Sequence, residues 1–226
     1  MSIKNNYNHT VFACYLGYVV QAIVNNFAPL LFLTFQKEFS IPLEKITLLI
    51  TLNFLFQLVV DVIAAKFVDK IGYRKCIVAA QFFSAIGIAG LGVFSNLFND
   101  PYYGLLVSIL LYALGGGLIE VLVSPIVEAC PIKAKKAAMS LLHSFYCWGH
   151  VAVVLLSTAF FALCGISNWK VLACLWALIP LFNAVYFSQV PIYPIGGEQE
   201  KMSLGKMLKQ KVFWLLIILM ICAGAS

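Results

Sequence analysis

Two acidic side chains lie within long apolar runs of this sequence, where charged residues are rare. They are Asp61 and Glu120, and a third apolar run carries His143 and His150. An ionised acid near the centre of a membrane helix costs about 2.5–3.5 kcal/mol, so it normally faces a cavity or a partner. Carboxyl and imidazole groups can bind and release protons in such places. Glu120, Asp61 and His143 are therefore the candidates for proton chemistry.

Four apolar segments each carry polar residues spaced about three or four positions apart. These stripes are Tyr18, Gln21 and Asn25 with the neighbouring Asn26; Asn53, Gln57 and Asp61; Gly116, Glu120, Ser124 and Glu128; and His143, Tyr146, His150 and Ser157. Residues so spaced share one face of a helix, so four helices would line a central hydrated path. Two further apolar segments carry only isolated polar residues. We expect six of the polar residues to face a bound solute: Gln21, Asn25, Asn26, Asn53, Gln57 and His150.

A structural alternative applies to the same stripes. Hydrogen bonds between membrane helices contribute about 0.6 kcal/mol each on average, and single Asn or Ser residues commonly make them. Glu120 fits this alternative poorly, because three small residues at 115–117 precede it and offer no side-chain partner. The glycine triplet itself favours close packing of helices.

Enzymatic chemistry has little support in the sequence. No nucleophile stands beside a base in a recognisable pattern, and the seven cysteines are scattered singly rather than at metal-ligand spacings. We therefore expect no enzyme activity, no cofactor and no metal site.

The composition requires lipid as the main solvent. Of the residues, 62% are hydrophobic and 11% are charged, whereas a soluble domain has about 25% charged residues. The net charge of +6 comes from short basic clusters between apolar runs, which argues against a nucleic-acid partner. The bilayer is the partner that this composition predicts.

Six segments are long enough to span a bilayer as helices, which takes roughly 20 residues each. They cover about 10–36, 46–68, 76–97, 103–128, 138–164 and 169–190, and a seventh begins near Val212. This pattern predicts an all-α polytopic membrane protein with three parts. Residues 1–190 would form a six-helix bundle, 191–211 a cytoplasmic linker with an interfacial helix, and 212–226 the start of a truncated seventh helix.

The basic residues predict the orientation. If the N-terminus is cytoplasmic, 12 of the 15 Lys and Arg residues fall on the inner side, and only Lys37, Lys45 and Lys170 fall outside. Loops rich in Lys and Arg remain on the cytoplasmic side. We therefore expect a cell-membrane protein with its N-terminus in the cytoplasm.

The segment from Ala65 to Lys75, AKFVDKIGYRK, resembles the loop signature of the major facilitator superfamily, G-x-x-x-D-R-x-G-R-R/K. Asp69, Gly72 and Arg74 match it, whereas Ala65 replaces its first glycine. The resemblance implies a six-helix half of that fold, built as a 3+3 inverted repeat, with a carboxy-terminal half to follow. It also implies that the first, second, fourth and fifth helices line the cavity.

The same resemblance implies a cytoplasmic gating cluster. Ser124-Pro125-Ile126-Val127-Glu128 looks like the acidic partner that the family places opposite this loop. Asp69 and Arg74 can form charge-assisted bonds to helix ends, and Gly72 permits the tight turn. The implied cluster comprises Asp69, Gly72, Arg74, Lys75 and Glu128. Ordinary positive-inside loop charges are the alternative.

Within the superfamily, the sequence is most similar to the fucose:proton symporter branch. The similarity rests on residues 22–26 and 35–39 and on Gly117-Leu118-Ile119-Glu120 with Ser124-Pro125. Glu120 falls on that branch's membrane carboxyl in its fourth helix, which is implicated in proton coupling. The branch's acid in the first helix corresponds to Pro29 here, which leaves Asp61 as a substitute.

The resulting expectation is a proton-coupled secondary transporter of a small polar solute such as a sugar. Two alternatives remain open: export of drug-like amphiphiles, for which a cavity richer in aromatic rings than in amides would be the sign, and an inactive truncated membrane fragment.

Overall fold

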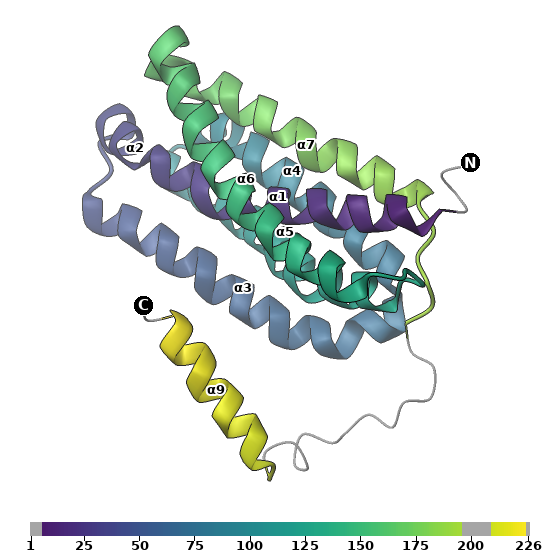
Figure 1. Ribbon diagram of the computed structural model, residues 1–226. Helices are drawn as coiled ribbons and strands as arrows, with labels where there is room; N and C mark the ends of the chain where they lie inside the picture. Colours follow the sequence, from purple (N-terminus) through teal and green to yellow (C-terminus); the bar gives the residue numbers. More distant parts are fainter. Residues whose placement is uncertain (1–5, 196–208, 225–226) are drawn as a thin grey trace. The chain divides into compact units, whose positions relative to one another are not determined.

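The computed structural model describes residues 6–195 and 209–224, and the secondary structure of these residues is entirely helical (Figure 1). The chain divides into two units, Met1–Ile195 and Gly196–Ser226. The second unit contains α9 (Lys211–Gly224). The expected interfacial helix of the linker lies almost wholly outside the described residues.

The first unit holds six helices that are long and apolar enough to cross a membrane. Its elements are α1 (Tyr7–Leu30), α2 (Phe32–Phe39), α3 (Leu43–Ile71), α4 (Tyr73–Leu97), α5 (Pro101–Ala129), α6 (Lys135–Cys164), the short 3-10 helix η2 (Ile166–Asn168) and α7 (Trp169–Gln189). Five of the six spanning helices match predicted segments to within a few residues at each end. The expected all-α polytopic fold is confirmed.

The first predicted segment, 10–36, is not one helix. It breaks at Leu31, between α1 and α2. Pro29 has no N–H to donate to the carbonyl of Asn25, so one helical hydrogen bond is missing just before the break. The Leu31 N–H instead bonds to the carbonyl of Ala28 at 2.9 Å, which tightens the last turn of α1.

Glycines hold the pair α4–α5 together at its closest approaches. A Cβ atom on Gly87 would lie 2.4 Å from the backbone nitrogen of Tyr112, and one on Gly104 would lie 2.2 Å from the carbonyl oxygen of Phe94. Two membrane helices gain packing energy from such close contact. On its other side α4 packs against α7, while α1 packs against α5, α6 and α7, and Figure 1 shows these helices running alongside one another.

Polar contacts hold α7 at both of its ends. Near its start, the indole Nε1 of Trp169 donates to Glu38 Oε2 of α2 at 2.7 Å, and Lys170 pairs with Glu38 Oε1 at 3.0 Å. At its finish, Arg74 Nη1 donates to the carbonyls of Phe187 and Ser188 at 3.1 and 3.0 Å. A cation at a helix C-terminus also interacts favourably with the helix dipole.

Candidate functional site

A cavity of about 250 Å³ lies where α1, α5 and α6 meet. Its lining side chains are Tyr18, Gln21 and Asn25 from α1, Glu120 from α5, and His143 and Tyr146 from α6. Three of the four predicted stripes thus supply residues to one polar space. α4 and α7, which carry only isolated polar residues, contribute none.

The fourth stripe, on α3, reaches this cavity through Gln57. Its Nε2 donates to Asn25 Oδ1 at 3.0 Å and to Asn53 Oδ1 at 2.9 Å. Its Oε1 accepts from Gln21 Nε2 at 3.0 Å. Gln21, Asn53 and Gln57 are all buried. One amide therefore links three others across α1 and α3, two of which line the cavity.

Glu120 is the carboxyl group that lines the cavity directly. Gln21 Nε2 lies 3.4 Å from Glu120 Oε2, a long hydrogen bond, and the Glu120 side chain is otherwise exposed. An acid in this position can hold its proton, or bond a solute hydroxyl, without breaking a strong ion pair.

Asp61 lies close to this site but is not part of the cavity wall. It is half-buried on α3, one turn beyond Gln57, and within electrostatic range of Glu120. Its Oδ1 is buried without a hydrogen-bond partner among the described residues. Buried polar atoms ordinarily have such partners, so this oxygen can accept a hydrogen bond from a water molecule or a bound group.

The glycines at 115–117 bring the polar helices together. A Cβ atom on Gly116 would lie 2.9 Å from Gln21 Oε1, and one on Gly117 would lie 3.0 Å from the carbonyl oxygen of Gln57. Gly115 instead faces α4, where its Cβ would lie 2.2 Å from Ser84 Oγ. The expected close-packing role of the triplet is confirmed: its three members face three different helices.

Several stripe residues lie elsewhere. Asn26 Nδ2 donates to the carbonyl of Ala22 in its own helix at 2.8 Å. Ser157 accepts a hydrogen bond from Trp176 Nε1 at 3.1 Å, and so belongs to the contact between α6 and α7. His150 is exposed and does not line the cavity.

Within the described residues, no cluster of His, Cys, Asp and Glu could hold a metal ion.

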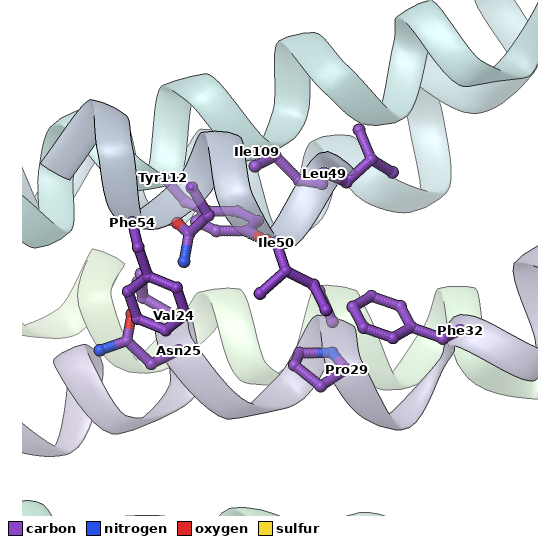
Figure 2. Close-up of a pocket in the computed structure, with 11 residues that line it drawn as sticks. Val24, Asn25, Pro29, Phe32, Leu49, Ile50, Phe54, Ile109 and Tyr112 are labelled. Carbon is purple, nitrogen blue, oxygen red and sulfur yellow. The ribbon is translucent and has the colours of Figure 1, made fainter. Parts of the chain in front are cut away.

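Asn53 lines a second, much smaller cavity beside Asn25. Figure 2 shows the apolar residues around it, with Pro29 and Phe32 on one side and Ile50 and Phe54 on the other. Its volume of about 10 Å³ is near the least that holds one water. Of these two cavities, the larger is the one with room for a solute.

The sequence model of the Major Facilitator Superfamily matches residues 14–226. The chain belongs to this superfamily. A search of the curated proteins gives no match. Together with the six spanning helices, this membership makes the chain a multi-pass membrane protein of the transporter class.

The loop signature of the superfamily occupies the junction of α3 and α4. Gly72 joins the two helices with a φ of 98°, a backbone conformation that favours glycine. Arg74 and Lys75 follow in the first turn of α4, and both are exposed. Glu128 is exposed near the end of α5, and its carbonyl accepts from Lys135 Nζ at 2.8 Å. Arg74 donates to the carbonyls at the end of α7, so the joining of Arg74 with Glu128 stays a prediction.

Tyr18 and Tyr146 line the cavity of this transporter but were not among the expected solute contacts. Both belong to predicted stripes, three residues from Gln21 and His143 respectively. This helical spacing is the feature of the sequence that could have identified them as cavity residues. The Tyr18 hydroxyl lies 3.2 Å from Ser124 Oγ, and its ring lies 5.6 Å from that of His143. Tyr18 therefore contacts both α5 and α6 at the cavity.

Proposed function

We propose that this chain belongs to a secondary active transporter that moves a small polar solute by alternating access with proton coupling. The observation that carries the proposal is the cavity that Glu120 lines together with His143, with the amide of Gln21 3.4 Å from the Glu120 carboxyl group. A carboxyl group in a space shared with the solute can link the binding of a proton to the binding of that solute.

The lining chemistry favours a solute with several hydroxyl groups, such as a sugar. Gln21 and Asn25 offer amide groups, Tyr18 and Tyr146 offer phenolic hydroxyls, and Glu120 accepts hydrogen bonds. The resemblance to the fucose:proton symporter branch supports the same class. A lining richer in rings than in amides is the sign expected for export of amphiphilic drugs, and here three rings stand beside two amides. Export is still less favoured, because each of these rings carries a polar atom.

The proposal extends to the gate, the orientation and the rest of the transporter. Asp69, Gly72, Arg74, Lys75 and Glu128 would form the cytoplasmic gate in a chain whose N-terminus is cytoplasmic and which lies in the cell membrane. Residues 1–190 would form the first bundle and 191–211 the linker to a carboxy-terminal half. In one state of the cycle Glu128 would approach Arg74.

A double-mutant cycle tests the gate. Arg74→Gln and Glu128→Gln, alone and together, should change the transport rate non-additively, because each removes the same interaction. Strictly additive effects would show that the two residues act apart.

The central test replaces Glu120 with Gln, which keeps the shape and hydrogen bonding of the side chain but cannot ionise. In proteoliposomes of the transporter containing this chain, we expect the wild type to accumulate labelled sugar when a pH gradient is imposed. Glu120→Gln should abolish this accumulation while retaining solute exchange across the membrane. Glu44→Gln, which changes an exposed acid in the first turn of α3, should behave as the wild type.

Accumulation by Glu120→Gln at the wild-type level would assign Glu120 a structural role and move proton coupling to Asp61. Loss of exchange as well as accumulation would make Glu120 a solute ligand rather than a coupling group.

A further inference from the structure

A groove of about 440 Å³ lies between the start of α4 and the end of α7, away from the solute cavity. Its six lining residues are Arg74, Lys75, Val78, Ala79, Phe82 and Ser188. The positions 75, 78, 79 and 82 share one face of α4 because they are three and four residues apart. The groove therefore has a cationic mouth and an apolar wall that runs along the helix.

The apolar wall is on the surface of the membrane-spanning part. Phe82 is 41% exposed, and Ile86, one turn further along α4, is 48% exposed. Neither α4 nor α7 contributes a residue to the solute cavity. A solute in transit therefore has no contact with this groove, whereas an acyl chain beside α4 does.

The mouth carries two positive charges and no negative one. None of the six lining residues is acidic. Lys75 makes no hydrogen bond or ion pair within the described part of the chain, and it is exposed. Its ammonium group is therefore available to an anion at the level where the helix leaves the membrane.

Arg74 is held in place at this mouth. Both of the bonds that it makes to described residues leave from Nη1, toward the carbonyls of Phe187 and Ser188. A guanidinium group has five N–H donors in a rigid fork. With Nη1 fixed on the end of α7, the remaining donors are oriented without a further loss of side-chain freedom.

We propose that this groove binds one anionic phospholipid. The phosphate would be held by Arg74 and Lys75, and one acyl chain would lie along Val78, Ala79 and Phe82. Basic pockets between membrane helices recognise acidic lipid headgroups in this way. The lipid would join α4 to α7 at the end where the loop signature lies, and this role does not depend on which solute is transported.

Native mass spectrometry of the purified protein in mild detergent tests the proposal. With phosphatidylglycerol or phosphatidylcholine of the same acyl chains added at equal concentration, we expect one phosphatidylglycerol to bind about 25-fold more tightly than phosphatidylcholine, about fivefold for each of the two basic residues. Lys75→Ala should weaken phosphatidylglycerol binding about fivefold, the effect of one basic residue near a lipid surface. Ala79→Trp should weaken it too, by filling the acyl groove without any change of charge.

Lys136→Ala is the matched control, because Lys136 is an exposed lysine in the first turn of α6 and does not line the groove. It should leave lipid binding unchanged. Glycerol 3-phosphate should displace the lipid poorly, since it lacks acyl chains. The proposal is overturned if both lipids bind equally, if Lys75→Ala retains wild-type binding, or if glycerol 3-phosphate competes as well as the lipid. Lys75→Ala alters only an exposed side chain, so it decides the question even if Ala79→Trp fails to fold.

Discussion

Gln57 connects more of the site than any acidic residue does. Its amide bonds to Gln21, Asn25 and Asn53, so the orientation of two helices depends on one side chain. Both of its polar atoms are committed to protein partners, whereas Glu120 makes one long hydrogen bond to the residues that the structure describes. The site thus combines a rigid amide network with a loosely held acid, an arrangement suited to an acid that must change partners during a cycle.

We expect Gln57→Leu to lower the free energy of unfolding by about 1–2 kcal/mol, from three lost bonds at about 0.6 kcal/mol each. Unfolding in sodium dodecyl sulfate, followed by circular dichroism, measures this change. The control Asn26→Leu loses one bond to its own helix and should cost at most about 0.6 kcal/mol. Equal costs for the two variants would mean that the network does not couple the helices.

At the scale of elements, the helices divide by how they pack. α4 touches α5 at backbone distance, and glycines make this contact possible. α3 and α6 bury the smallest shares of their spans, 28% and 17%. The pair α4–α5 is therefore the closely packed frame of this unit, whereas α3 and α6 leave more of their surface available to lipid or to further helices of a transporter.

Gly87→Ala should separate α4 from α5, because a Cβ there would lie 2.4 Å from the backbone nitrogen of Tyr112. Overpacking of this kind costs about 1–3 kcal/mol, measurable as a lower midpoint of unfolding. The same substitution at Gly17 is the control: its Cβ would meet the Val123 side chain at 3.2 Å, and a side chain can shift slightly. A loss of stability at Gly17 as large as that at Gly87 would contradict this account.

At the scale of the whole molecule, charge is distributed unevenly between the loops. The α3–α4 junction carries Lys70, Arg74 and Lys75, and the α5–α6 loop with the start of α6 carries Lys133 and Lys135, while the short loop from α4 to α5 contains no basic residue. This asymmetry sets the orientation during insertion and predicts which loops can be reached from outside the cell.

A cysteine at position 206, in protein without its seven native cysteines, should escape a membrane-impermeant maleimide in intact cells. It should be labelled once the cells are permeabilised. A cysteine in place of Asn99, between α4 and α5, should react from outside. Labelling of position 206 in intact cells would reverse the proposed topology.

The sequence predicts spans and stripes well because both depend on periods within one helix. Hydropathy located the six spanning helices, and spacing of three or four residues gathered Gln21, Asn25, Glu120 and His143 around one cavity. The contacts that the sequence does not predict depend on partners from other helices. Ser157 shares a stripe with His143 but bonds to Trp176, and periodicity within α6 carries no information about α7.

Two other features cannot be predicted from the sequence, because they too depend on neighbouring helices. The partners of Arg74 are backbone carbonyls at the end of α7, and a carbonyl has no signature in the sequence. The break at Leu31 depends on Pro29, yet membrane helices often continue through proline because neighbours satisfy the freed backbone groups. Only the geometry of the surrounding helices determines which outcome occurs.

The close contact of α4 with α5 has a consequence for synthesis of the protein. Only residues 98–100 separate the two helices, so a short loop brings α4 and α5 together and their contacts need no other element. Closing a short loop costs little chain entropy. The hairpin can therefore assemble as soon as α5 leaves the ribosome, while α6 and α7, which α1 needs as neighbours, have not yet been made. The later helices would then pack against a hairpin that has already formed.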